Sequence, residues 1–145
     1  MATIIVRPLT FSRTLPRRTS TRRIVLHHTA GGDKTVESIH QMHLARRGFH
    51  GIGYHFLIRH SGAIYQGRPI QAVGQHASRA NSDSIGIALT GNFQTARPTE
   101  QQMNSLRLLI RHIRQRHAHW AGLPVVRHRD VGATACPGRN FPAIV

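Results

Sequence analysis

The chain has 145 residues, a length that fits one domain with one hydrophobic core and leaves no room for a second folded module. Hydrophobic residues make up 39% of it and occur in short patterned runs, so we expect a folded protein. A single cysteine excludes an internal disulfide, and its thiol is therefore a buried apolar group, a reactive group or a metal ligand.

The formal net charge of +15 is carried almost entirely by arginine, with Lys34 as the one lysine. Such a chain attracts polyanions, and the phosphate and carboxylate groups of nucleic acid, lipopolysaccharide and anionic cell-wall polymers all suit an arginine fork. Charge alone does not choose among them. With two tyrosines and one tryptophan there is little material for base stacking, and no nucleic-acid-binding motif is recognised.

The amino-terminal residues 1–22 are rich in Arg, Thr, Ser and Pro. We expect a basic, partly ordered lead-in on the surface of a domain formed by residues 23–145. No apolar run has the length of a signal peptide or of a membrane-spanning segment. We therefore expect a protein that is made in the cytoplasm and carries no readable targeting signal.

Short β-rich runs alternate with helical patterns along the domain. The run "RRIVLHH" (22–28) is typical of a buried strand that leads into a glycine turn. The runs 53–59 and 63–67 are joined at "HSG", which is typical of a β-hairpin. We expect further strands at 83–92 and 123–128.

Two helices are predicted between these strands. Asp33 or Thr35 can cap the first, which ends near Gly48, and Thr99 with Gln102 forms a capping box for the second. The core-facing stripe of the first helix is Val36, Ile39, His40 and His43, and that of the second is Met103, Leu106, Leu109, Ile110 and Ile113. The alternation of strands and helices predicts an α/β fold: a single domain with a central mixed β-sheet flanked by helices.

The outer face of the second helix carries arginines. They are Arg107, Arg111, Arg114 and Arg116. A solvated helix face is the ordinary interpretation of such a charge run, and a dedicated anion-binding ridge is the alternative.

The segment "RHRDVGATACPG" (127–138) holds a candidate metal site. Catalytic zinc sites use three protein ligands drawn from His, Cys and carboxylates. Cys136 is the only thiol, and His128 precedes it by a loop that can bring both side chains to one ion. A neighbouring strand end offers His27 or His28 as the third ligand; alternation along a strand allows only one of them, and spacing does not decide which.

Four segments carry a resemblance to a known family: "IVLHHTAGG", "GIGYHFLIRHSGAIYQGRP", "VGQHASRANSDSIGIALTGNF" and "HRDVGATACPG". Their order and spacing resemble the zinc-dependent N-acetylmuramoyl-L-alanine amidases of the phage-lysozyme (type 2 amidase) and peptidoglycan-recognition-protein family. The resemblance covers residues 23–141, and four motifs in register are far more specific than one. It implies a mixed sheet flanked by helices, with Zn²⁺ in a groove that receives the peptidoglycan stem peptide.

The resemblance also assigns roles to individual residues. The zinc ligands are then His27, His128 and Cys136, and Tyr54 stands beside the zinc-bound water as a catalytic residue. Thr134 is the second catalytic candidate; phage enzymes of this kind often carry lysine there, whereas recognition-protein amidases carry threonine. A hydroxyl can donate a hydrogen bond to an oxyanion but brings no positive charge.

Further positions are expected around the site. His76 and Asn81 match residues that line the substrate groove in relatives, and His55 is a candidate for contact with the glycan. Asp130 is a candidate acceptor for the free ring N–H of His128, because metal-bound histidines commonly donate to a carboxylate.

The activity implied is hydrolysis of the amide bond between N-acetylmuramic acid and L-alanine, with zinc lowering the pKa of a water towards ~7. We expect a monomeric endolysin of bacterial cell lysis, held in the host cytoplasm and acting on periplasmic peptidoglycan. Its positive charge is expected to contact anionic outer-membrane or wall polymers.

Two alternatives remain open. The first is a non-catalytic peptidoglycan-binding protein of the same fold, although relatives that bind without cutting typically lack the cysteine ligand that is present here. The second is an amidase that also binds a polymerase or nucleic acid, which the charge permits but no motif supports.

Overall fold

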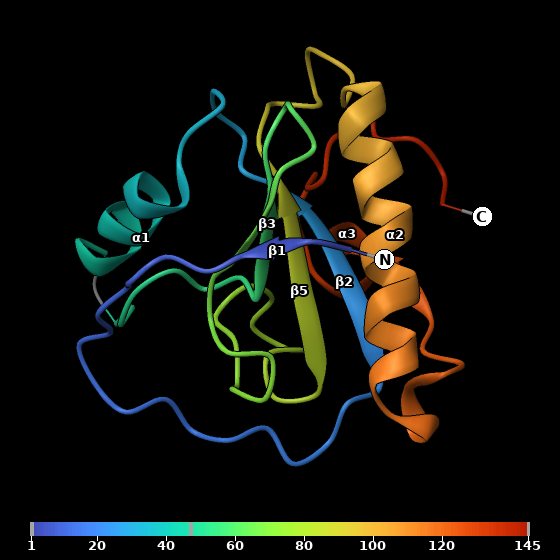
Figure 1. Ribbon diagram of the computed structural model, residues 1–145. Coiled ribbons are helices and arrows are strands. Elements are labelled where there is room, and N and C mark those ends of the chain that lie inside the picture. The colour runs from blue at the N-terminus through green and yellow to red at the C-terminus, as the bar shows by residue number, and fades with distance from the viewer. Residues whose placement is uncertain (1, 47, 145) are drawn as a thin grey trace.

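A computed structural model describes residues 2–46 and 48–144. One mixed sheet of six strands, in the order β1-β4-β3-β5-β2-β6, separates a long helix on one face from a short helix on the other (Figure 1). The predicted α/β fold with a central mixed sheet is therefore confirmed.

The two longest strands of the sheet are parallel and paired along their whole length. They are β2 (Arg23–His28) and β5 (Ser84–Leu89), and burial on both faces explains their continuous apolar runs. On one side, β3 (Phe56–Ile58) joins β5 and forms the predicted hairpin with β4 (Ile64–Gln66). On the other side, β6 (Val125–Arg127) pairs with β2 in parallel.

Alternation along β2 sorts its side chains between the two faces. Ile24 and Leu26 join the larger core, under the long helix, whereas Val25 belongs to a smaller cluster on the opposite face. His27 shares the face of Val25 and His28 that of Leu26, because successive side chains point to opposite faces of a strand. The strand therefore divides its two histidines between different environments.

The helices follow the caps that the sequence predicts. In α1 (Val36–Leu44), Thr35 is the cap, and the helix ends ahead of Gly48. In α2 (Glu100–Arg116), both hydrogen bonds of the capping box are present, and the predicted apolar stripe is buried. A 3₁₀ helix, η1 (Ala118–Trp120), and a short helix, α3 (His128–Val131), follow. Within the described residues, no helix has the length and apolar character needed to cross a bilayer.

The amino-terminal segment is more closely attached to the domain than composition alone suggests. Ile4 and Ile5 form the edge strand β1, parallel to β4. The Arg18 side chain is only 4% exposed, and it donates to the carbonyl oxygens of Ile70 and Ala72. The sequence did not predict this strand or this buried arginine. A boundary between lead-in and domain at residue 22 stays a prediction.

Candidate metal centre and substrate cavity

Three side chains converge where β2 and β6 end. His27 is near the end of β2, His128 directly follows the adjacent parallel strand β6, and Cys136 lies in the loop beyond α3. One ligand atom from each residue lies within 4.8 Å of the other two. The His27 Nδ1 to Cys136 Sγ distance is 3.7 Å, and a tetrahedral zinc site places a nitrogen and a sulfur ligand about 3.6 Å apart. The donor set and its spacing therefore fit zinc.

The structure decides between the two adjacent histidines. The Nδ1 atom of His28 accepts a hydrogen bond from the backbone N–H of Phe93 at 3.0 Å, on the other face of the sheet. The backbone N–H of His28 lies 3.4 Å from Cys136 Sγ and so supports the sulfur. His27 supplies the ring at the candidate metal centre, and His28 contributes its backbone.

The ring of His27 is held from behind by a second histidine. Its Nε2 atom lies 2.8 Å from Nδ1 of His76, and the two rings meet edge to face. The Nε2 atom of His76 in turn lies 3.2 Å from the hydroxyl oxygen of Ser84. Both histidines are buried.

Burial sets the protonation of the site. It holds the pKa of His27 well below its usual value, and the nearby His128 lowers this pKa further. Burial likewise lowers the pKa of His76 and raises the pKa of the Cys136 thiol to about 11. The imidazoles are therefore neutral, the form in which histidine binds metal, and binding of a metal ion would displace the thiol proton.

The metal centre forms part of the wall of a cavity of about 440 Å³. Tyr54 lines it, with its ring 5.2 Å from that of His27. Burial raises the pKa of Tyr54 above its usual range, so its hydroxyl keeps its proton as a hydrogen-bond donor. Thr134 also lines the cavity; its exposed hydroxyl accepts from the Cys136 N–H, which leaves its own proton available.

The predicted groove residues His76 and Asn81 also line the cavity, but the ring nitrogens of His76 and the Oδ1 atom of Asn81 are engaged by the protein. The Asn81 Oδ1 atom accepts from the backbone N–H groups of His76 and Ala77, at 2.7 and 2.8 Å. Asn81 therefore holds the loop that carries His76 in place.

His55 does not fit the expectation of a glycan contact. Its side chain is fully buried and is not part of the cavity wall. Its Nδ1 atom accepts from the Gly86 N–H at 2.9 Å, and its Nε2–H donates to the Ala72 carbonyl at 2.7 Å. The ring lies deeper in the protein than the cavity wall, packed beside His76 with 5.7 Å between the ring centroids.

Asp130 does not bond to His128 either. Its carboxylate accepts from the backbone N–H of Arg127 at 2.9 Å and from the Arg127 guanidinium at 3.1 Å. The expectation that it accepts from His128 is wrong, because the carboxylate instead caps the short helix α3, in which both residues lie.

Other cavity residues were not predicted from the sequence. They are Ala30, His43, Arg46, Phe49, Gln75, Ala77 and Ser78. His43 was recognised only as part of the buried stripe of α1, and its Nδ1 atom accepts from the Gly53 N–H. The Arg46 guanidinium stands over the Phe49 ring, 4.7 Å from the ring centroid. The packing of α1 on the sheet brings His43, and Arg46 and Phe49 just after the helix, to the cavity, whereas the other four lie in the quoted motifs without having been singled out.

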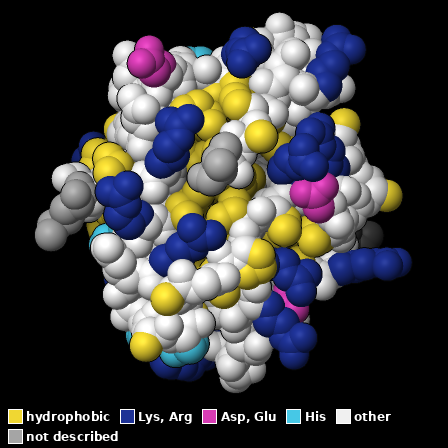
Figure 2. Space-filling model, turned by 90° about the vertical axis from the view of Figure 1, so that its right-hand side faces the viewer, with side chains coloured by type: hydrophobic (Ala, Val, Ile, Leu, Met, Phe, Trp, Pro, Cys, Tyr) yellow, Lys and Arg dark blue, Asp and Glu magenta, His cyan; other side chains and the backbone are white. Residues whose placement is uncertain are grey.

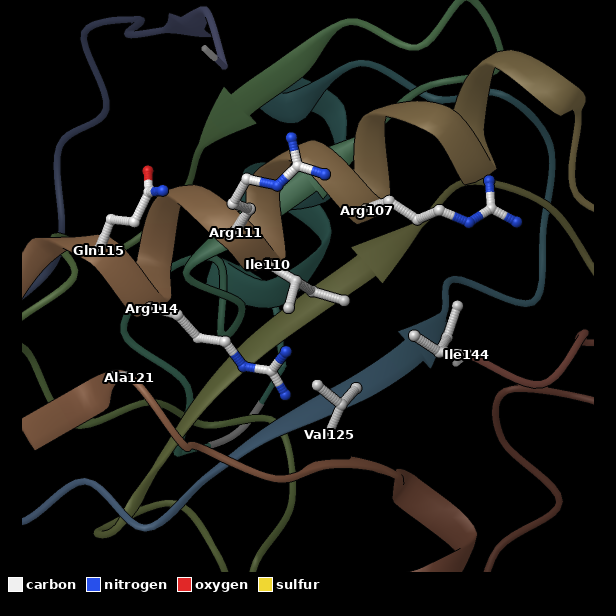
Figure 3. A pocket seen from close by; sticks show the side chains of 8 residues that line it. All are labelled: Arg107, Ile110, Arg111, Arg114, Gln115, Ala121, Val125 and Ile144. Atoms are coloured by element: carbon white, nitrogen blue, oxygen red, sulfur yellow. The ribbon is translucent and has the colours of Figure 1, made fainter.

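A second cavity, of about 460 Å³, lies between α2 and β6, and we call it the arginine pocket. On this face of the molecule, arginine side chains surround an apolar area (Figure 2). Figure 3 shows the side chains that line the pocket: Arg107, Ile110, Arg111, Arg114, Gln115, Ala121, Val125 and Ile144. None of these described lining residues is acidic. Arg114 is fixed by two hydrogen bonds to the Leu123 carbonyl, whereas Arg107 and Arg111 are exposed.

Known proteins share this sequence pattern and this fold. The chain is 39% identical to a peptidoglycan-recognition protein of Drosophila simulans over 143 residues, which cover 92% of this chain and 78% of that protein. The N-acetylmuramoyl-L-alanine amidase LysC of Clostridium intestinale URNW superposes with a TM-score of 0.91 at 41% identity, over 98% of this chain and 93% of that one.

A second similar structure contains a ligand. Peptidoglycan recognition protein-LE, solved in complex with tracheal cytotoxin, a monomeric diaminopimelic acid-type peptidoglycan, has a TM-score of 0.85 at 27% identity, over 95% of this chain and 89% of that one. Residues 17–139 match the family model described as N-acetylmuramoyl-L-alanine amidase, Amidase_2. With its fold and its converging histidines and cysteine, the chain belongs to the Amidase_2 family, which includes endolysin amidases and peptidoglycan-recognition proteins.

Proposed function

We propose that the protein hydrolyses the amide bond between N-acetylmuramic acid and L-alanine in peptidoglycan, with Zn²⁺ as its cofactor. The observation that carries the proposal is the convergence of His27, His128 and Cys136, at the spacing of a zinc site, in the wall of an open cavity. Three protein ligands leave a fourth position free, which is the arrangement of catalytic zinc sites.

The residues around the metal centre have different roles in the proposed reaction. Bound zinc would supply an acidified water and polarise the scissile carbonyl. Tyr54 and Thr134, which line the same cavity, are placed to donate hydrogen bonds to the oxyanion. Protonation of the leaving amine falls to Tyr54 or to solvent water.

The names of similar proteins support the substrate and the biological role. A structural neighbour from Clostridium intestinale is described as an endolysin amidase, and recognition protein-LE was solved with a peptidoglycan fragment. We propose that this chain likewise acts as an endolysin, which accumulates in the host cytoplasm and reaches the peptidoglycan during lysis.

A receptor that binds peptidoglycan without cutting it is the second candidate function. It is favoured by the recognition proteins among the sequence relatives. The intact His-His-Cys set favours the enzyme, because a purely binding groove has no need of converging metal ligands.

The test is digestion of purified peptidoglycan by the zinc-loaded protein, with and without a chelator. The amidase is expected to release new L-alanine amino groups without new reducing sugars, and the chelator should stop this release. Binding of peptidoglycan without release of amino groups would instead establish the receptor. New reducing ends would show cleavage of the glycan and would overturn the proposal.

We further propose that the arginine pocket binds lipopolysaccharide of the outer membrane. Lipopolysaccharide presents phosphate groups beside acyl chains, and the pocket presents Arg107 and Arg111 beside the apolar side chains of Ile110, Val125 and Ile144 (Figure 3). Arginine forks match phosphate geometry, and the apolar floor favours an acylated anion over a purely polar polymer.

Binding to lipopolysaccharide micelles tests this partner. The double variant Arg107→Gln/Arg111→Gln is expected to bind about tenfold more weakly, because two charge-assisted contacts are lost. The control Arg13→Gln/Arg22→Gln removes the same charge from exposed positions outside the pocket. Equal weakening by both variants would show that only net charge matters, and undiminished binding of deacylated lipopolysaccharide would exclude a role for the apolar floor.

A further inference from the structure

The buried side chains behind the metal centre form a connected series of hydrogen bonds. From these contacts we infer that His76 and Ser84 are positioning residues, which hold His27 in the tautomer that carries its proton on Nε2 and leaves Nδ1 free for the metal. The inference rests on the metal centre of the proposed function. It gives the motif around His76 a role in metal binding, in place of the substrate contact that the family resemblance implies.

The series starts at the carbonyl oxygen of Ala80, which can accept a hydrogen bond but cannot donate one. The Ser84 hydroxyl donates its single proton to the carbonyl oxygen of Ala80, which is only an acceptor. The Ser84 oxygen therefore faces the Nε2 atom of His76, 3.2 Å away, as an acceptor. His76 must then carry its proton on Nε2.

The direction of the next bond follows. A neutral imidazole has one proton, so a His76 ring protonated on Nε2 presents a lone pair at Nδ1. That lone pair lies 2.8 Å from the Nε2 atom of His27, which must be the donor. The remaining nitrogen of His27, Nδ1, then has a lone pair directed towards Cys136 Sγ, 3.7 Å away. This lone pair is what a metal ion requires.

The opposite tautomer of His27 costs a hydrogen bond. A proton on Nδ1 would occupy the metal position and would leave a lone pair at Nε2 facing His76. His76 would then have to donate from Nδ1, which places its Nε2 lone pair against the oxygen of Ser84. Only a Ser84 hydroxyl that turns its proton from the Ala80 carbonyl to Nε2 of His76 relieves that contact, and because these groups are buried, no water replaces the bond that is lost.

The ring of His76 is also held in position by the backbone on both sides. A Cβ atom at Gly86 would lie 2.6 Å from Cγ of His76, and one at Gly74 would lie 2.5 Å from its Cδ2. Two glycines therefore leave the slot that the ring occupies, while Asn81 holds the backbone of His76. Residues 74–86 thus supply the two glycines that make room for the ring, the ring of His76 itself, and the accepting hydroxyl oxygen of Ser84, all behind the metal ligand His27.

Substitutions at His76 test the inference through zinc affinity, measured by competition with a chelating dye. His76→Phe keeps a ring but removes the acceptor, and it is expected to weaken zinc binding about 10- to 100-fold, as the loss of such supporting partners typically does. In His76→Asn, an amide oxygen replaces Nδ1 as the acceptor, and affinity is expected within about threefold of the native protein. Ser84→Ala, which leaves both tautomers of His76 open, should fall between these two variants.

His40→Phe is the matched control. His40 is also buried and uses both ring nitrogens, accepting from the Ile52 N–H and donating to the Thr10 carbonyl, but it lies outside the metal centre. It is expected to lower stability in urea without changing the affinity for zinc. Equal zinc affinity of His40→Phe and His76→Phe, measured on folded protein, would overturn the inference.

A direct reading of the tautomer needs neither activity nor a variant. In the ¹⁵N-histidine spectrum of the metal-free native protein, His27 is expected as the Nε2–H tautomer. A proton on Nδ1 would overturn the inference even if every substituted protein failed to fold. Native zinc binding with the predicted losses, but without release of L-alanine amino groups, would instead overturn the proposed function and leave this inference standing.

Discussion

The metal centre and the arginine pocket use opposite ways of holding polar groups. At the metal centre, His27 and His128 lie at the ends of adjacent strands, and His27 and His76 are fixed by hydrogen bonds inside the protein. In the arginine pocket, Arg107 and Arg111 extend from an exposed helix face. The first arrangement suits chemistry that depends on geometry, and the second suits binding through charge. Changes at the metal centre should therefore have large, specific effects, and changes in the pocket should have small effects that depend on salt.

The largest effect is expected from removing a metal ligand. Cys136→Ser should lose bound zinc, and its amidase activity should fall by at least about a thousandfold, since the metal contributes several kcal/mol to the transition state. Zinc content and release of L-alanine amino groups measure the two losses. Zinc returned after chelation should restore the native protein but not the variant, and retained zinc at full stoichiometry would contradict the ligand set.

The variant Tyr54→Phe distinguishes the contribution of the oxyanion hydrogen bond from that of the metal. We expect kcat to fall about 10²- to 10³-fold, because one preorganised hydrogen-bond donor to the oxyanion is lost. Zinc content should not change, because the hydroxyl is not a ligand. A rise in KM alone, with kcat preserved, would mean that Tyr54 binds substrate and does not act on the transition state.

Lowering the pH should destabilise the metal-free protein at pH values well above those at which carboxylates titrate. Burial lowers the pKa of His43 to about 4 and that of His55 to about 3, and it also depresses those of His27 and His76. Below about pH 6.5 the unfolded chain therefore binds protons that the folded chain does not. The free energy of unfolding should fall by about 1.4 kcal/mol per pH unit for each such histidine.

Urea unfolding between pH 8 and pH 4.5 checks this dependence. Stability should be constant above about pH 7 and should fall steadily as the pH drops through the usual histidine range. A free energy of unfolding that stays constant down to pH 5 would show that the histidines become protonated in the folded protein. It would contradict a rigid metal centre.

Thr134 should matter less than Tyr54. Thr134→Val removes the hydroxyl proton and is expected to lower kcat about tenfold, whereas Thr134→Ser should stay near the native rate. The smaller effect follows from exposure, because solvent can replace an exposed donor. A loss as large as that of Tyr54→Phe would place Thr134 at the centre of oxyanion binding.

The smallest effect on catalysis is expected in the arginine pocket. Arg107→Gln/Arg111→Gln should cleave purified peptidoglycan within about twofold of the native rate, because distant sites without shared partners act independently. The difference in lipopolysaccharide binding between this variant and the native protein should shrink as the salt concentration increases. A large loss of activity on purified peptidoglycan would show that the pocket belongs to the substrate site and would remove the contrast between the two regions.

Local sequence signals predicted much of the fold. Thr99 and Gln102 indicated the start of α2, and the hairpin of β3 and β4 followed from "HSG" between two β-rich runs. The edge strand β1 was missed because two apolar residues in a basic segment give no periodic signal. Pairing with β4 stabilises this strand, and no local propensity reports such pairing.

The candidate site was predicted in part, and the misses have a common cause. Spacing and resemblance placed Cys136 and His128 together, because a short loop joins them. Position in the motif did not show that His55 is buried or that Asp130 bonds to Arg127, since both outcomes depend on which way a side chain faces.

By itself, the sequence determined the order of the strands β2 to β6 and of the helices α1 and α2, the positive charge, and the supply of one thiol and many histidines. Spacing left His27 and His28 open and the resemblance implied His27; the tertiary structure placed the His27 ring beside His128 and Cys136, turned His28 to the opposite core, and put His76 behind His27. The physical reason is that metal binding and hydrogen-bond direction depend on distances between atoms on separate strands. Those distances are set by the pairing and packing of the sheet, which no local stretch of sequence contains.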